Sequence, residues 1–167
     1  MASKLTQIKK ENEYERALII SVDTGDFDAD VSAAELTELA KTAGAEVVGV
    51  MIQKREAPSA ASYVGSGRLA EIREFCAANE IALVIADGEL TPVQARNIED
   101  AADAKVVDRT MLILDIFAQR ARSAEGKIQV ELAQLKYTLP RLARSEEHLT
   151  LKARRRNWHK GPRRNKT

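Results

Sequence analysis

The amino-acid sequence predicts an α/β fold: a small parallel sheet flanked by helices, followed by one long helix and a disordered basic tail. Short apolar runs alternate with helical patterns over residues 17–108, and the connections between them are short. From Arg109 onward, a stretch of about 30 residues lacks proline, which is typical of a long helix. The composition then becomes strongly basic. The predicted regions are a flexible lead-in (1–16), an α/β subdomain (17–108), a long helix (109–142) and the tail (143–167).

Four short apolar runs, most of them rich in β-branched residues, are predicted to form the strands. They are Ala17–Val22, Val47–Ile52, Ala82–Ala86 and Lys105–Asp108. Because helical patterns separate them, the strands are expected to pair in parallel, with the helices covering the sheet.

Three helical patterns lie between these strands. The first covers Ala33–Thr42, with Ser32 as its predicted N-cap and Gly44 as the residue that ends it. The second covers Arg68–Asn79.

The third helix is marked by its N-terminal residues. Thr91 is a good N-cap, and Pro92 suits the first helical position because that position needs no backbone N–H. This helix is expected to end near Ala102.

Apolar residues recur at steps of three and four from Arg109 to about Leu139, and Gly126 is the only glycine in this stretch. A single helix of this length would extend about 45 Å and project beyond the subdomain. It would need a partner helix to cover its apolar stripe, and the sequence predicts no second long helix. We therefore expect self-association through the unpaired stripe.

The sequence favours a cytoplasmic protein. No apolar run approaches the roughly 18 residues of a membrane span. The first residues, MASKLTQIKKENEYER, are polar and lack the apolar stretch of a secretory signal. Cys76 is the only cysteine, which excludes an internal disulfide and a cysteine-based zinc site.

Charge is distributed unevenly along the chain. Nine of the 26 Lys and Arg residues, but only two of the 25 acidic residues, follow residue 142. The first 142 residues therefore carry 17 basic and 23 acidic side chains. A basic tail after an acidic body usually indicates a nucleic-acid-binding arm.

The sequence contains no recognisable catalytic centre or metal site. The phosphate-loop pattern G-x-x-x-x-G-K-S/T is absent from the 167 residues. One glycine-rich loop precedes a predicted helix, where backbone N–H groups could bind a phosphate. The alternative is a tight turn that requires positive φ. The residues of this loop are Gly65, Ser66, Gly67 and Arg68.

Three stretches resemble the HflX family of ribosome-associated GTPases. The most specific is DRTMLILDIFAQRARSAEGKIQVELAQLKYTLPRL at Asp108–Leu142, and YVGSGR at Tyr63–Arg68 and IADGELTPVQARNIE at Ile85–Glu99 also match. The resemblance covers about Glu15–Leu142. It implies that a Gly-rich loop, a second antiparallel helix and a G domain that uses GTP and Mg²⁺ follow this region in family members.

The resemblance implies a role for this chain as the N-terminal ribosome-binding and regulatory region of such a protein. The expected partner is the large ribosomal subunit and its RNA. Because the phosphate loop is absent here, we expect no cofactor in this chain and no GTP hydrolysis by it. The residues expected to contact ribosomal RNA are Arg120, Arg122, Lys127 and Lys136.

The tail departs from the family pattern after about Ser145. Permitted codons for Arg156–Thr167, read one nucleotide later, encode Gly-Ile-Gly-Thr-Arg-Gly-Pro-Gly-Glu-Thr-Lys, which matches the family's Gly-rich loop. We therefore expect the tail to be an out-of-frame version of that loop and the chain to be truncated before the G domain. Two alternatives remain: a stand-alone RNA-binding protein with a basic tail, and a small nucleotide-binding module that uses the Gly65–Arg68 loop.

Overall fold

The computed structural model describes the backbone of residues 14–158 and the side chains of residues 14–141. Its α/β subdomain contains a four-stranded sheet in the order β2-β1-β3-β4, in which every strand pairs in parallel with its neighbour. The fold class predicted from the sequence is therefore confirmed. The strands are β1 (Glu15–Asp23), β2 (Ala45–Lys54), β3 (Leu83–Ala86) and β4 (Lys105–Asp108).

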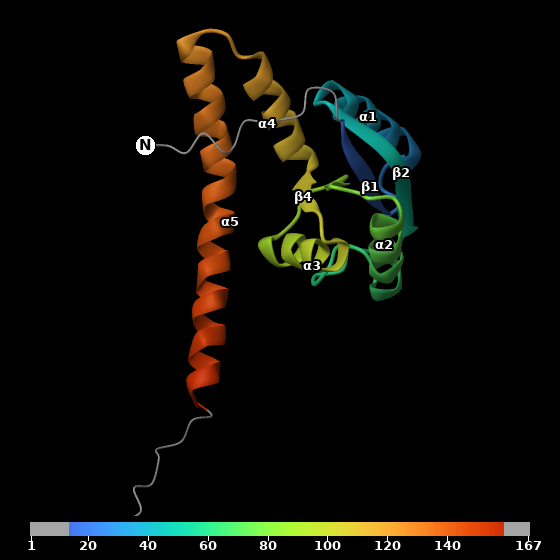
Figure 1. The fold of residues 1–167 in the computed structure, drawn as a ribbon, viewed down its shortest axis with the longest axis vertical. Helices are drawn as coiled ribbons and strands as arrows, with labels where there is room; N and C mark the ends of the chain where they lie inside the picture. Colours follow the sequence, from blue (N-terminus) through green and yellow to red (C-terminus); the bar gives the residue numbers. More distant parts are fainter. Residues whose placement is uncertain (1–13, 159–167) are drawn as a thin grey trace, which may run out of the picture.

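Helices cover both faces of this sheet (Figure 1). They are α1 (Ala29–Thr42), α2 (Ser66–Ala78), α3 (Pro92–Ala102) and α4 (Arg109–Arg120). Side chains of α2 and α3 pack with Leu18 and Ile20 on one face, and side chains of α1 and α4 pack with Ile19 on the other. Alternate residues of β1 thus point into two separate cores, which is why the centre of this strand is a continuous apolar run.

Local sequence signals fix most of the helix ends. Thr91 caps α3 in a capping box with Gln94, and Pro92 occupies the first helical position, as predicted. Gly44 follows α1 with φ of 91°, a conformation that glycine adopts without strain. The predicted N-cap of α1 was wrong: α1 begins earlier, and Asp28 accepts the hydrogen bond from Val31 N. Ser32 lies inside the first turn.

The single long helix predicted after β4 was also wrong. Two helices, α4 and α5 (Ala124–Trp158), are joined by a turn at residues 121–123 and form a hairpin (Figure 1). Ala121 has an extended backbone, with ψ of 124°, and Ser123 Oγ accepts a hydrogen bond from Gly126 N at 3.0 Å. This serine cap starts α5 in a new direction, although no proline marks the break.

The second helix therefore returns alongside the first. Gln134 Nε2 on α5 donates to Asp115 Oδ1 on α4 at 3.3 Å. The α4 helix therefore has a helical partner in α5, which the sequence did not predict. Large apolar side chains of α5 stay exposed, namely Ile128, Leu132, Leu135 and Leu139, and self-association stays a prediction. Within residues 14–158, no helix combines the length and apolar character needed to cross a membrane.

The two ends of the chain differ from the predicted boundaries. The β1 strand begins at Glu15, and residues 1–13 of the predicted lead-in lie outside the described residues. The tail was predicted to lack structure from residue 143. The α5 helix continues as far as Trp158, and residues 159–167 lie outside the described part.

Candidate nucleic-acid interface

The turn between α4 and α5 gathers three of the four cations predicted to contact RNA. Arg120 is the last residue of α4, Arg122 lies in the turn, and Lys127 lies in the first turn of α5. All three side chains are exposed. We call Arg120, Arg122 and Lys127 the tip cations.

The charges of the tip cations face solvent. Within residues 14–141, none of their side chains forms a hydrogen bond or an ion pair. One carboxylate, Glu125, lies in the same segment, and it accepts a hydrogen bond from Gln129. The tip therefore presents an excess of positive charge to solvent, on donors that are free to bind an external anion.

The fourth predicted cation, Lys136, lies elsewhere. It is exposed on α5, nine positions after Lys127 in the sequence. At 1.5 Å per residue, this spacing places it about 14 Å further along the helix axis. The structure thus brings three of the four residues together and separates the fourth.

Apolar side chains accompany the tip cations. Phe117 on α4 and Ile128 on α5 are both large, and both are more than half exposed. Exposed aromatic and apolar groups beside arginine are suited to stacking on unpaired bases, whereas lysine and arginine contact phosphates. The tip therefore offers both kinds of contact that single-stranded RNA accepts.

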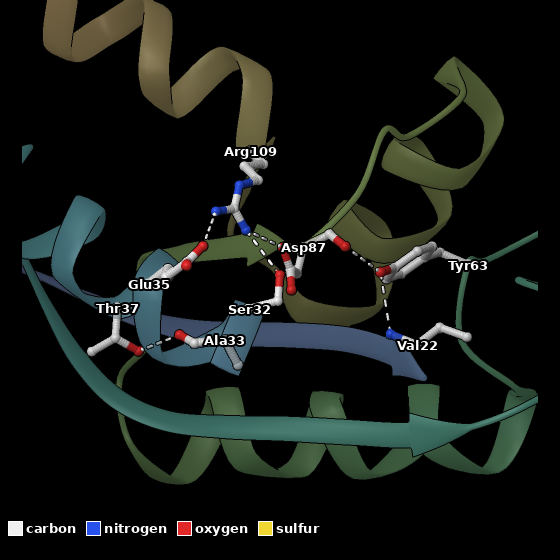
Figure 2. A network of polar contacts seen from close by, with 8 residues as sticks. All are labelled: Val22, Ser32, Ala33, Glu35, Thr37, Tyr63, Asp87 and Arg109. Carbon is white, nitrogen blue, oxygen red and sulfur yellow. Dashed lines mark hydrogen bonds and ion pairs between the residues drawn. The ribbon is translucent and has the colours of Figure 1, made fainter. Parts of the chain in front are cut away.

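A partly buried polar cluster joins the first residue of α4 to α1 and to the end of β3 (Figure 2). Arg109, the first residue of α4, donates to Asp87 Oδ1 at 2.9 Å, to Ser32 Oγ at 3.0 Å and to Glu35 Oε2 at 3.0 Å. The Asp87 side chain is 3% exposed and that of Arg109 is 28% exposed. One guanidinium therefore links α4 to α1 and to the residue that follows β3.

The neighbouring residue in sequence fixes the second helix of the hairpin. Asp108 is buried, caps α4 by accepting from Met111 N, and accepts from Leu90 N at 3.3 Å. Its Oδ2 also accepts a hydrogen bond from Tyr137 on α5. This bond and burial raise the pKa of the Tyr137 hydroxyl, with burial the larger cause. Adjacent residues Asp108 and Arg109 thus hold both helices against the subdomain.

Tyr63 connects two of the motifs noted in the sequence. Its hydroxyl accepts from Val22 N at 3.2 Å and donates to the Asp87 carbonyl at 3.1 Å (Figure 2). Burial raises the pKa of Tyr63 to about 12. The YVGSGR loop is therefore pinned to the Asp87-Gly88 turn, a contact that the sequence did not predict.

The carboxyl edge of the sheet is the usual location of a ligand crevice in open α/β folds, at the point where the strand order reverses. Here that point lies between β1 and β3, and Arg109, Asp87 and Tyr63 occupy it. Within the described residues, Ser21 Oγ and Asp87 Oδ2 are buried without a hydrogen-bond partner. The same part of the chain holds no group of three or more His, Cys, Asp or Glu residues placed to bind a metal.

The glycine-rich loop lies at the N-terminus of α2, as predicted. Gly65 is the N-cap, and its N–H donates to Gln53 Oε1 at 2.8 Å. Arg68 pairs with Glu71 at 2.8 Å. Gly65 has φ of −67°, so the turn does not require positive φ there. A Cβ at Gly65 would lie 2.7 Å from Arg55 Nη1, the far end of a flexible side chain that can move away, so space alone does not require glycine here. Phosphate binding by Gly65–Arg68 stays a prediction.

Sequence-family models match both parts of the chain. A family described as GTP-binding GTPase N-terminal matches residues 30–118, and one described as GTP-binding GTPase middle region matches residues 120–163. The boundary between the matches falls at the end of α4, so the first contains most of the α/β subdomain with α4 and the second contains α5.

Two relatives of this chain are both named GTPase HflX. The chain is 52% identical over 128 residues to GTPase HflX of Caldanaerobacter subterraneus subsp. tengcongensis, covering 77% of this chain and 30% of that protein. It is 47% identical over 115 residues to GTPase HflX of Escherichia coli, covering 69% of this chain and 27% of that protein. The chain thus spans less than a third of the length of these relatives.

Solved structures agree with these matches. A GTP-binding protein from the archaeon Sulfolobus solfataricus, in complex with GDP, has a TM-score of 0.59 and 28% identity, covering 84% of this chain and 42% of that one. The G235P variant of SsGBP has a TM-score of 0.62 and 28% identity, covering 79% and 41%.

Proposed function

This chain belongs to the HflX family of GTP-binding proteins, and we propose that it is the N-terminal ribosome-binding part of such a protein. In this proposal, the tip cations contact the RNA of the large ribosomal subunit, in the cytoplasm. The observation that supports it is the clustering of Arg120, Arg122 and Lys127 at an exposed turn, without internal ion partners in the described residues.

The geometry supports a division of roles between the hairpin and the α/β subdomain. The tip lies at the far end of a hairpin whose base is held by Asp108 and Arg109. A rigid base preorganises the tip, so less entropy is lost when its side chains bind. The α/β subdomain would then act as a frame that positions the tip, and it would carry no RNA contact itself.

The test is binding of the 167-residue chain to purified large ribosomal subunits, measured by pelleting. The variant R120A/R122A/K127A should bind at least about tenfold more weakly, because fewer phosphates are neutralised. The dependence of log affinity on log salt should also flatten, by roughly 0.7–0.9 for each phosphate that the variant no longer neutralises.

A matched control removes the same charge from the subdomain. Lys41, Lys54 and Lys105 are exposed there, and K41A/K54A/K105A should leave both the affinity and the salt dependence nearly unchanged. Equal weakening by the two triple variants would show that net charge, and not the tip, drives binding, and the proposal would then be abandoned.

We also propose that this chain does not turn over GTP by itself. Its relatives are named GTPases, but the phosphate-loop pattern G-x-x-x-x-G-K-S/T does not occur among its 167 residues. Phosphate release from GTP should stay at background with the purified chain, with and without large subunits. Turnover that copurifies with the chain through two unrelated columns would refute this.

A further inference from the structure

Tyr63 is held in a strained backbone turn. Its φ is 65°, in the left-handed region that is costly for a bulky side chain. It is the middle residue of a three-residue turn in which Val64 N donates to the Ser62 carbonyl at 2.6 Å, and with positive φ this is the strained form of the γ-turn. Two backbone hydrogen bonds of 2.9 Å between Ser59 and Tyr63 hold the turn closed. The Tyr63 side chain is buried, so the turn places its ring inside the subdomain.

The Tyr63 hydroxyl lies where β1 and β3 would otherwise pair directly. Asp87 N donates to the Ile20 carbonyl at 2.9 Å, and in a parallel ladder the next bond runs from Val22 N to the Asp87 carbonyl. Here Val22 N donates instead to the Tyr63 hydroxyl at 3.2 Å, and that hydroxyl donates to the Asp87 carbonyl at 3.1 Å (Figure 2). The tyrosine is therefore a wedge inserted into the ladder at the carboxyl ends of the two strands.

Within the described residues, two buried polar atoms beside the wedge, Ser21 Oγ and Asp87 Oδ2, have no hydrogen-bond partner. Ile20 pairs with Ala86 in the parallel register. The next pair would be Ser21 with Asp87, whose side chains would lie on the same face of the sheet. Direct pairing would bring the Ser21 hydroxyl toward the Asp87 carboxylate, and one bond would satisfy both groups. Withdrawal of Tyr63 would thus relieve the strained turn and the two unpaired groups together.

We propose that Tyr63 is a removable wedge that couples the loop between β2 and α2, residues 55–65, to the α4–α5 hairpin. When the wedge withdraws, Val22 N bonds directly to the Asp87 carbonyl, and Asp87 moves toward β1. Arg109 follows, because its guanidinium is bound to Asp87 Oδ1 at 2.9 Å, and it is the first residue of α4. Arg109 thus holds the base of the hairpin in both states, but at two different positions. Neither state depends on RNA binding, because the tip cations take no part in the wedge.

Opposing contributions set the balance between the two states. Burial of the tyrosine ring stabilises the wedged state. Two side chains of α3 hold the same loop in place: Gln94 Nε2 donates to the Ser59 carbonyl at 2.8 Å. Asn97 Nδ2 donates to the Ala61 carbonyl at 2.6 Å. Because the strained turn and the unpaired polar groups favour withdrawal, a change on either side should shift the populations of the two states.

Two glycine substitutions form a matched test of the wedge. A Cβ at Gly88 would lie 3.3 Å from the Tyr63 hydroxyl, so Gly88→Ala crowds the wedge but removes no hydrogen-bonding group. A Cβ at Gly67 would point into open space, so Gly67→Ala is the control. Neither glycine has positive φ, so alanine fits the backbone at both positions. Tyr63→Gly removes the wedge and provides the withdrawn end state.

Amide chemical shifts of the full chain, measured by nuclear magnetic resonance, report the populations of the two states. Leu112 on α4 packs on the face of the sheet opposite to the Tyr63 ring, so its amide responds to movement of α4 and not to loss of the ring. The Leu112 signal should move furthest in Tyr63→Gly, part of the way along the same line in Gly88→Ala, and not at all in Gly67→Ala. A signal that stays in place in either of the first two variants, leaves the line, or moves equally in Gly67→Ala would overturn the coupling.

A scalar coupling across the hydrogen bond identifies the new ladder bond directly. Tyr63→Gly should show coupling between the Val22 nitrogen and the Asp87 carbonyl carbon, which the intervening hydroxyl prevents in the wild-type chain. If Tyr63→Gly does not fold, Tyr63→Phe replaces it in both measurements, because it keeps the packed ring and removes only the hydroxyl. Absence of this coupling in each Tyr63 variant that folds, or an equal coupling in the wild-type chain, would overturn the wedge.

Discussion

The α/β subdomain and the α4–α5 hairpin are built on different principles. The subdomain buries β1 between two cores and ties distant segments together through Arg109, Asp87 and Tyr63. In the hairpin, one side of α5 packs against α4, while the tip cations and the apolar residues Ile128, Leu132, Leu135 and Leu139 are exposed. One region provides a rigid frame, and the other presents the groups that remain free to interact.

The largest effect is expected where the frame meets the hairpin. Arg109→Ala leaves the buried Asp87 carboxylate without its cation, and should destabilise the chain by about 3 kcal/mol. Urea denaturation followed by circular dichroism measures this. Glu35 also contacts Arg109 but is mostly exposed, so Glu35→Ala should cost less than about 1 kcal/mol. Similar losses for the two variants would show that the buried Arg109–Asp87 pair does not dominate this junction.

A smaller loss is expected for Tyr63→Phe, which removes two buried hydrogen bonds and should cost about 1–2 kcal/mol at neutral pH. The pKa of Tyr63 rises from 10.0 to about 12 on folding, so the unfolded chain loses this proton first as the pH increases. Stability from this group is therefore complete below pH 10 and is lost between pH 10 and 12.

The wild-type chain should accordingly lose stability more steeply than Tyr63→Phe over that pH range. Chemical denaturation at stepped pH values measures the difference between the two proteins. Parallel pH profiles would indicate that Tyr63 does not titrate differently in the folded and unfolded states.

Tyr137→Phe should act mainly on the hairpin. It removes the hydrogen bond to Asp108 and should cost about 1 kcal/mol, while Tyr14→Phe, at an exposed tyrosine, should cost almost nothing. Hydrogen exchange should accelerate in α5 and stay unchanged in β1 and β3. Acceleration in the strands would mean that the frame and the hairpin unfold as one unit.

The same contrast explains how much the sequence predicted. In the subdomain the signals are local: apolar runs fixed four strands to within two residues, and the Thr91-Pro92 pair located the start of α3. The exception, Ser32, was chosen as a cap, but Asp28 has the better position and the serine hydroxyl binds Arg109 instead. The partner of the Ser32 hydroxyl lies 77 positions away in the sequence, so local patterns do not reveal it.

The break in the hairpin left no strong local signal. Residues 121–123 contain neither proline nor glycine, and the apolar spacing continues through them. The Ser123 cap and the packing of α5 against α4 decide the turn, and such packing is a tertiary effect. The cations of the site were predicted individually, but their clustering followed from the turn. The junction residues Asp87, Asp108 and Arg109 were missed, although acidic residues at the ends of adjacent parallel strands indicate a shared edge.

The smallest global effect is expected at the tip. Ser123→Ala removes the cap of α5, a change worth about 1 kcal/mol in a packed helix. Because the tip is exposed, the result should be local fraying near Ala124 with little change in the urea midpoint. Thr91→Ala removes a cap inside the subdomain and should lower the midpoint measurably. If Ser123→Ala lowered the urea midpoint more than Thr91→Ala does, the hairpin tip, and not the subdomain, would be the region that stabilises the fold.

Photo-crosslinking to large ribosomal subunits tests most directly whether the hairpin tip, and not the subdomain, faces RNA. A crosslinking residue is placed at position 122 in the tip or, for comparison, at position 54 at the end of β2. Both chains should bind the subunit, but only the chain labelled at position 122 should crosslink to ribosomal RNA. Crosslinks to RNA from position 54 with none from position 122, while the chain stays bound, would contradict this account of the molecule.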